Sequence, residues 1–296
     1  MLLSEIGVVA VVGAGQMGAG IAQVCAQHGY RVLLADASVE RAESAKLGID
    51  KQLARLRDKG KLAESDCDLV SSRIEATSAE GAFPLADLVI EAATENRELK
   101  LALFEQADAL AKPHAILASN TSSISITLLA GRTKRADRVI GMHFMNPVPV
   151  MKLVELVHGL QTSPETLATV RALAEALHKT VIVSRDRPGF QVNRMLIPFI
   201  NEACFALEEG TGSAADIDQG ARLGLNHPLG PLELADLIGL DTVLAIARVL
   251  EHDFGDPKYR APIMLKNLVA AGYLGKKTKR GFYVYDEQGA KVRTEP

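Results

Sequence analysis

The stretch Val8-Val9-Ala10-Val11-Val12-Gly13-Ala14-Gly15-Gln16-Met17-Gly18 predicts how the first half of this chain folds. Its opening apolar run is typical of a parallel strand that is buried on both faces. The glycines that follow predict a tight turn whose backbone approaches another group closely, and the next residues predict a helix. The sequence therefore indicates a strand, a glycine turn and a helix in succession.

Asp36 adds a second signal. It ends the apolar run Leu33-Leu34-Ala35, about 20 residues after the glycines, the spacing at which an acid reaches the ribose of a dinucleotide. Its charge would repel a 2′-phosphate, so NAD is favoured over NADP. The structural alternative is an ordinary turn followed by a solvated aspartate. The residues expected to bind NAD at this turn are Gly13, Gly15, Gln16, Met17 and Gly18.

Apolar runs alternate with helix-like segments through the first half of the chain. This alternation predicts an α/β fold with a doubly wound, mostly parallel sheet. The strand-like runs lie at residues 6–12, 31–36, 88–91, 116–119 and 138–141, and two more at 151–157 and 181–184 extend the sheet beyond six strands.

The chain's 296 residues fit two domains. Arg187-Pro188-Gly189 breaks the strand pattern, so we predict a cofactor domain over residues 1–185 and a second domain over 186–296. The second domain is expected to be all-helical, because its segments show no alternating strand pattern. Its helix-like segments lie at residues 190–209, 215–223, 232–250 and 261–271.

The charge balance favours a small-molecule partner. The 33 basic and 36 acidic side chains are mixed along the chain and give a net charge of −3, which argues against nucleic acid and anionic membranes. The three cysteines lack the paired spacing of a metal or redox centre, so no metal is expected. With no secretory signal and no run of ~20 apolar residues, the sequence predicts a cytoplasmic protein.

Polar loops follow two of the predicted strands, at the sheet edge where ligands bind in such folds. Ser122 follows the strand 116–119 and is placed to offer a hydroxyl to a reacting oxygen, and Asn120 is expected to contact the cofactor. Glu95 and Lys100 follow the strand 88–91 and are expected to line the cofactor cleft. The alternatives are helix caps and first-turn residues, which these types also favour.

His143 and Glu155 form the strongest candidate for proton transfer. Glu155 lies in an apolar strand, where a carboxylate is costly unless it is paired, and His143 lies across a Pro-rich turn. A histidine suits a general base near neutral pH, and a carboxylate fixes its tautomer. The alternative is a structural histidine with a solvated glutamate.

Asn193 begins the first long helix of the second domain, where its amide would reach a substrate held between the domains. The alternative is a local bond to backbone.

Taken together, these residues resemble the L-3-hydroxyacyl-CoA dehydrogenase family, and within it the short bacterial 3-hydroxybutyryl-CoA dehydrogenases. The resemblance covers essentially the whole chain. Its motifs are Val12–Gly18, Glu91–Asn96, Ser119–Ser123, His143–Glu155, Pro188–Arg194, Pro228–Asp236 and Gly281–Tyr283.

The resemblance implies a Rossmann-like NAD-binding domain and reversible oxidation of an L-3-hydroxyacyl-CoA to the 3-ketoacyl-CoA. It points to a short-chain substrate, such as 3-hydroxybutyryl-CoA. It implies that His143 is the general base, with Glu155 as its partner, and that the second domain forms a homodimer. It further implies that Ser122 and Asn193 bond the C3 oxygen, that Asn146 positions substrate and nicotinamide, and that Asp36, Glu95 and Lys100 contact NAD.

For the coenzyme A part of the substrate, the resemblance points to Lys59 at the end of an exposed helix, with Lys51 and Arg55 nearby. Gln52 and Lys279 depart from the residues that relatives carry. Two other functions stay open: a dehydrogenase of a hydroxy acid or sugar acid without coenzyme A, and a non-catalytic NAD-binding structural or sensing protein.

Overall fold

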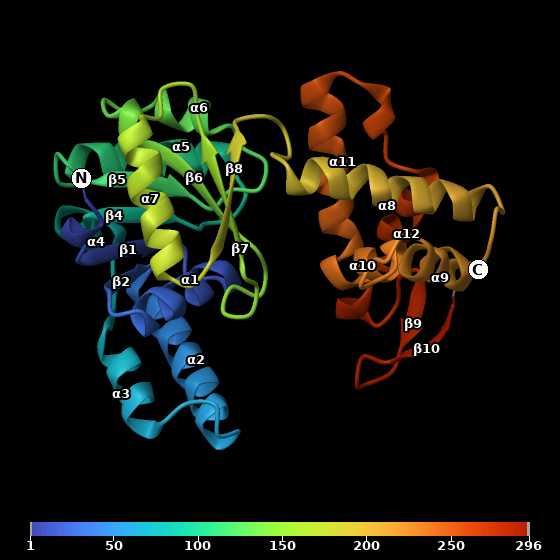
Figure 1. The fold of residues 1–296 in the computed structure, drawn as a ribbon, viewed down its shortest axis with the longest axis horizontal. Helices are drawn as coiled ribbons and strands as arrows, with labels where there is room; N and C mark the ends of the chain where they lie inside the picture. Colours follow the sequence, from blue (N-terminus) through green and yellow to red (C-terminus); the bar gives the residue numbers. More distant parts are fainter. Residues whose placement is uncertain (1, 295–296) are drawn as a thin grey trace. The chain divides into compact units, whose positions relative to one another are not determined.

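The computed structural model describes residues 2–294. The chain divides into two compact units between Arg187 and Pro188, and each is described by itself (Figure 1).

The first unit is built on one sheet with the strand order β3-β2-β1-β4-β5-β6-β7-β8. β7 runs antiparallel to β6, and β8 runs parallel to β7, while the pairs from β3 to β6 are parallel. The predicted doubly wound, mostly parallel sheet that extends beyond six strands is confirmed. The strands are β1(Val8–Val12), β2(Arg31–Ala35), β3(Ile74–Thr77), β4(Leu88–Glu91), β5(Ile116–Ser119), β6(Val139–Phe144), β7(Leu153–His158) and β8(Thr180–Arg185).

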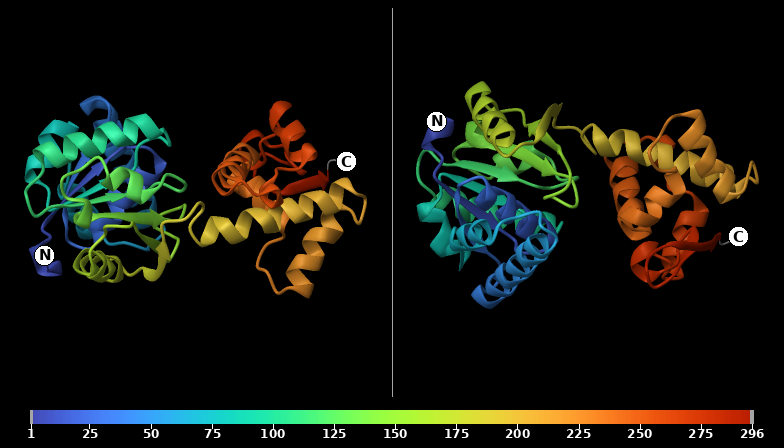
Figure 2. Two further views of the ribbon diagram at one scale, coloured as in Figure 1. Left: turned by 90° about the horizontal axis from the view of Figure 1, so that it is seen from above. Right: turned by 60° about the horizontal axis from the view of Figure 1, so that its bottom comes forward.

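Helices cover both faces of this sheet, because parallel strands present apolar side chains on each. α1, α2, α3 and α7 share one core with the sheet, and α5 packs on the other face. α2 and α3 extend beyond the sheet (Figures 1 and 2). The helices of this unit are α1(Gln16–Gln27), α2(Val39–Asp58), α3(Glu64–Ser72), α4(Ala79–Ala82), α5(Arg97–Leu110), α6(Ile126–Ala130) and α7(Pro164–Ala176).

The second unit is mainly helical, but it ends in a small sheet that the prediction of an all-helical domain missed. Gly239, at φ 102°, splits the predicted helix over 232–250 into two. The elements are α8(Val192–Glu208), α9(Ala214–Gly224), α10(Pro231–Ile238), α11(Leu240–Phe254) and α12(Ile263–Ala270), then the antiparallel pair β9(Tyr283–Tyr285) and β10(Lys291–Thr294). Short 3-10 helices lie at Leu3–Glu5, Phe83–Leu85, Ala136–Arg138, Pro257–Tyr259 and Lys276–Thr278.

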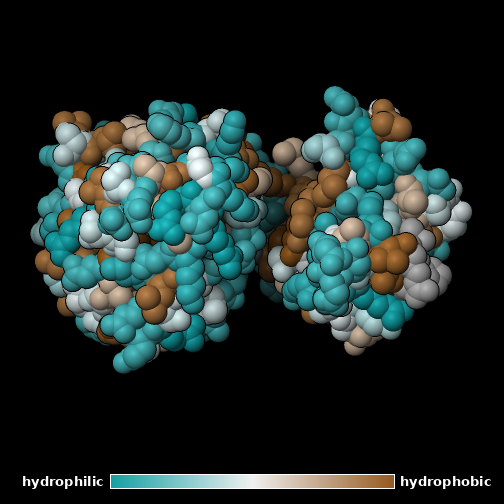
Figure 3. Space-filling view, turned by 90° about the horizontal axis from the view of Figure 1, so that it is seen from below, coloured by the Kyte–Doolittle hydropathy of each residue, from teal (hydrophilic) through white to brown (hydrophobic). Residues whose placement is uncertain are grey.

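The surface of the helical unit carries patches of apolar side chains (Figure 3). The large apolar side chains exposed on it include Met195, Leu223, Leu225, Leu237 and Ile263. Over the described part of the chain, no helix has the length and apolarity needed to cross a membrane.

Candidate active site

The carboxyl ends of the central strands meet at one edge of the sheet, because the strands are parallel and in register. Val12 pairs with Glu91, and Glu91 pairs with Ser119. The loops that follow these residues therefore lie next to one another, although they are far apart in the sequence. This is the edge at which open α/β sheets bind ligands.

The glycine turn after β1 fits a close-packed dinucleotide loop. Gly13 has φ 106°, and a Cβ there would lie 2.5 Å from the backbone of Ala92. At Gly18 a Cβ would lie 1.7 Å from the carbonyl oxygen of Gly13. At Gly15, the N-cap of α1, a Cβ would meet nothing within 4 Å, so the space in front of the helix N-terminus is open. Such a terminus favours a pyrophosphate.

Asp36 follows β2 and bonds directly to the glycine turn. Its Oδ2 accepts the N–H of Ala14 at 2.7 Å, and its Oδ1 lies 2.6 Å from the Arg41 Nε. Burial alone would raise the pKa of Asp36, but the N–H groups of Ala14 and Ala37 and the Arg41 guanidinium hold it below its ordinary value. The carboxylate is therefore ionised at neutral pH beside the turn.

Glu95 ties the loop after β4 to the loop after β5. Its Oε1 accepts the N–H of Ser122 at 3.0 Å and the hydroxyls of Thr121 and Ser123 at 2.5 and 2.8 Å. Burial alone would raise the pKa of Glu95, but Lys100 and these hydroxyl donors hold it below its ordinary value. The Ser122 hydroxyl itself lies 3.3 Å from the same oxygen. The structure thus brings Glu95 and Ser122 together.

Lys100 lies beneath this loop rather than at the surface. Its side chain is 1% exposed, and its amine donates to Glu91 Oε1 at 2.6 Å and to the Ala93 carbonyl at 3.1 Å. The amine also lies 3.4 Å from Glu95 Oε2. Glu95, with a side chain 37% exposed, is therefore the member of this group that faces outward.

His143 and Glu155 face each other across β6 and β7. They are paired in the antiparallel register, and Nδ1 of His143 lies 3.2 Å from Oε2 of Glu155. Their neighbours Met142 and Leu156 point into the core shared with α1 and α7. Because side chains alternate along a strand, His143 and Glu155 point to the opposite face of the sheet. The Glu155 side chain is fully buried. A buried carboxylate against an imidazole holds the ring in one orientation.

Hydrogen bonds from two side chains to the backbone fix the turn that joins these two strands. The Asn120 Oδ1 accepts the N–H of Phe144 at 2.9 Å, so the loop after β5 bonds to the end of β6. Lys179 was missed by the sequence analysis. Its buried amine donates to the carbonyls of Val148 and Met151 at 2.7 and 2.9 Å and so holds the turn that carries Asn146. The sequence shows a lysine directly before β8 but not the backbone carbonyls that its amine bonds.

The remaining predicted residues lie elsewhere. Asn193 is a buried residue in the first turn of α8, in the helical unit, so its part in substrate binding stays a prediction. Lys59 is exposed and directly follows the last residue of α2. Within residues 2–294, no group of three or more histidine, cysteine or acidic side chains is arranged to hold a metal.

Two family descriptions match the chain. Residues 8–187 match the NAD-binding domain of 3-hydroxyacyl-CoA dehydrogenase, and residues 189–285 match the C-terminal domain of the same enzyme. A Rossmann-like sheet with this glycine turn defines the class of dinucleotide-binding proteins. The chain belongs to the 3-hydroxyacyl-CoA dehydrogenase family, so it is an NAD-using oxidoreductase, and the resemblance seen in the sequence is confirmed.

Individual relatives agree with this assignment. A probable 3-hydroxybutyryl-CoA dehydrogenase of Bacillus subtilis is 51% identical over 96% of this chain and 99% of its own length. The crystal structure of (S)-3-hydroxybutyryl-CoA dehydrogenase from Ralstonia eutropha is 52% identical, with a TM-score of 0.92 over 96% of this chain and 100% of that one. A diketoreductase structure is 30% identical, with a TM-score of 0.83 over 95% of this chain and 99% of that one.

Proposed function

We propose that this chain oxidises a short L-3-hydroxyacyl-CoA, such as 3-hydroxybutyryl-CoA, to the 3-ketoacyl-CoA, and that it also catalyses the reverse reaction. The single observation that carries this proposal is the His143–Glu155 pair, 3.2 Å apart where β6 ends and β7 begins at the dinucleotide edge of the sheet. A non-catalytic NAD-binding protein has no need of such a pair.

His143 acts as the general base in this proposal. With its Nδ1–H donated to Glu155, the ring takes the proton of the C3 hydroxyl on Nε2. Glu155 keeps the ring in that tautomer and stabilises the imidazolium that results. In the reverse direction, His143 returns the proton to the C3 oxygen.

Three polar side chains orient the substrate in this scheme. Ser122 and Asn193 hydrogen-bond the C3 oxygen, and Asn146 aligns the substrate with the nicotinamide. The role of Ser122 is supported by its position in a loop at the sheet edge, where its backbone N–H donates to Glu95 at 3.0 Å. Asn193 is contributed by the helical unit, where it lies in the first turn of α8.

NAD binding is assigned to the glycine turn and to the residues around it. Gly13, Gly15, Gln16, Met17 and Gly18 would hold the pyrophosphate. Asp36 would accept the ribose hydroxyls and so exclude the 2′-phosphate of NADP. When bound, NAD supplies the acceptor for the C3 hydride.

Glu95, Lys100 and Asn120 complete the proposed cofactor set. Glu95 faces outward at the loop edge, while Lys100 supports it from below at 3.4 Å. Asn120 holds the end of β6 through the N–H of Phe144 and so keeps its loop beside the cofactor edge.

The coenzyme A moiety is assigned to the exposed cations Lys51 and Arg55 on α2 and Lys59 directly after it, which suit its phosphates. The apolar patches on the helical unit support a homodimer formed through that unit. We place the enzyme in the cytoplasm.

The second candidate function is a dehydrogenase whose substrate lacks coenzyme A. It is favoured by the likeness to the diketoreductase structure at 30% identity.

The test compares NADH formation from 3-hydroxybutyryl-CoA with that from free 3-hydroxybutyrate. We expect kcat/KM to be on the order of 100-fold higher for the thioester, because binding energy from the remote coenzyme A is used to orient the reacting carbon. Free acid with added coenzyme A is the control and should stay slow. Equal rates for the acid and the thioester favour the second candidate, and no NADH from either contradicts the proposal.

A further inference from the structure

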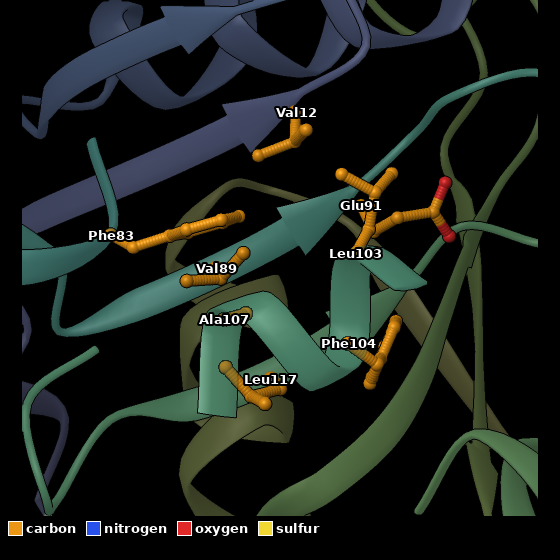
Figure 4. Close-up of a pocket in the computed structure, with 8 residues that line it drawn as sticks. All are labelled: Val12, Phe83, Val89, Glu91, Leu103, Phe104, Ala107 and Leu117. Atoms are coloured by element: carbon orange, nitrogen blue, oxygen red, sulfur yellow. The ribbon is translucent and has the colours of Figure 1, made fainter. Parts of the chain in front are cut away.

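Glu91 is a buried acid to which the proposed mechanism gives no role. It ends β4, its side chain is 2% exposed, and its carboxylate lies 2.6 Å from the equally buried amine of Lys100. Figure 4 shows the carboxylate turned away from the apolar side chains, among them Val89 and Leu117, that fill the space between the sheet and α5. The carboxylate therefore points toward the loops at the sheet edge.

Such a pair is expensive to bury. Burial raises the pKa of Glu91, and Lys100 and Ser119 oppose that rise. Replacing a buried ion pair by apolar residues of similar size is often neutral or stabilising, so stability alone is a weak reason for this one. The contacts that link Glu91 through Ser119 and Lys100 to the neighbouring loop give a better reason.

One branch runs from Glu91 through Ser119. The Ser119 hydroxyl donates to Glu91 Oε2 at 2.6 Å and accepts the N–H of Thr121 at 3.2 Å. Glu91 thereby fixes the first turn of the loop that carries Ser122. All of these atoms are buried, so water does not compete for the bonds.

A second branch runs from Glu91 through Lys100. The shared amine lies 3.4 Å from Glu95 Oε2, and the other oxygen of Glu95 accepts the N–H of Ser122 at 3.0 Å. Glu91 sets the position of that amine and therefore that of Glu95. Both branches converge on the loop of residues 119–123.

We propose that Glu91 is a positioning residue: acting through Ser119 and Lys100, it holds the 119–123 loop so that the Ser122 hydroxyl meets the substrate's C3 oxygen. The inference rests on the proposed function, which gives Ser122 that contact. Misplacing a positioned group by about 1 Å is enough to cost up to about 100-fold in rate.

The test is a double-mutant cycle in the full chain, with kcat for 3-hydroxybutyryl-CoA as the readout. We expect Glu91→Gln to lower kcat about tenfold and Ser122→Ala to lower it about 100-fold. In the Ser122→Ala background, Glu91→Gln should change kcat by less than about twofold, because the group that it positions is gone. An undiminished tenfold loss in that background overturns the inference.

Asp87, directly before the first residue of β4, provides a matched control. It is also a buried acid, 2.7 Å from the amine of Lys112, and it accepts the N–H groups of Gly7 and Val8. Asp87→Asn should lower Tm and leave kcat unchanged. If Asp87→Asn lowers kcat as much as Glu91→Gln does, the loss reports damage to the fold, and the inference is wrong.

A second variant covers the case in which Glu91→Gln does not fold. Ser119→Ala breaks the first branch without leaving a buried charge unpaired, and it should lower kcat severalfold with the same non-additivity toward Ser122→Ala. If Ser119→Ala and Glu91→Gln fold and turn over at the full rate while Ser122→Ala is slow, the inference about Glu91 is overturned and the proposed function stands. Full turnover by Ser122→Ala overturns the proposed contact of Ser122 and this inference with it.

Discussion

We propose that the choice between the two nicotinamide cofactors depends on Asp36. Its carboxylate is held ionised beside the glycine turn by Ala14, Ala37 and Arg41. We expect Asp36→Ala to lower the kcat/KM preference for NAD over NADP by about 10- to 100-fold, because a hydrogen bond to a charged group is lost and a repulsion is removed. Steady-state kinetics with both cofactors measure the ratio.

The control for Asp36 lies at the other end of the same strand. Arg31 begins β2 and forms an exposed ion pair with Glu75 at 2.8 Å. Arg31→Ala should leave the cofactor ratio where it is, because the pair is distant from the turn. An unchanged ratio in Asp36→Ala would show that another group sets the preference.

Single residues were predictable where the chemistry left few alternatives. Glu155 stood out because it lies within an apolar strand, and the structure places it against His143. Lys179 could not be found in this way, because its partners are backbone carbonyls whose positions depend on how the turn folds. A sequence shows which side chains need a partner, but not which backbone groups will provide one.

Among the elements, α10 and β9 are joined by one buried acid. Asp236 in α10 accepts the N–H groups of Phe282 and Tyr283 at 3.0 Å and the hydroxyl of Tyr285 at 2.9 Å. Burial raises the pKa of Asp236 to about 6 despite these donors. The folded protein therefore binds a proton there that the unfolded chain, with an ordinary pKa of about 3.9, has already released.

This shift predicts a pH dependence of stability. As pH rises from about 4 through 6, the favourable contribution of Asp236 to the free energy of unfolding is lost. Asp236→Asn should be less stable than the wild type, because an amide nitrogen cannot accept these bonds. The difference in stability between the wild type and Asp236→Asn should shrink as the pH rises from 5 to 7.5, because only the wild type carries the titrating group. Thermal melts at both values measure it.

Asp241 is the control for this melt comparison. It forms an ion pair with Lys277 at 2.5 Å. Burial alone would raise the pKa of Asp241, but Lys277 holds it below the ordinary value, so it stays ionised throughout this range. Asp241→Asn should therefore differ from the wild type by the same amount at pH 5 and 7.5. A difference for Asp236→Asn that is equally constant would contradict the assigned shift.

The elements that the sequence analysis missed are short or held from a distance. β3 has only four residues and no continuous apolar run. β9 has three residues, and bonds to Asp236 from Phe282, just before the strand, and from Tyr283, its first residue, span 46 and 47 residues. Periodicity within a short window cannot reveal such long-range bonds, whereas β1 and β4 were clear from their buried apolar runs.

At the scale of the whole molecule, the cofactor edge was predictable because parallel strands end together. Loops near residues 13, 91 and 119 meet for that reason alone, as the register of β1, β4 and β5 shows. The network from Glu91 to Ser122 was not predictable, since it depends on rotamers within the folded loops.

The most direct test of the central claim is the turnover of the full-length His143→Gln variant with NAD and 3-hydroxybutyryl-CoA. If His143 removes the hydroxyl proton, kcat falls by about 10²- to 10⁴-fold while the Kd for NAD stays that of the wild type. Near-normal kcat in a folded, NAD-binding His143→Gln protein would contradict the account.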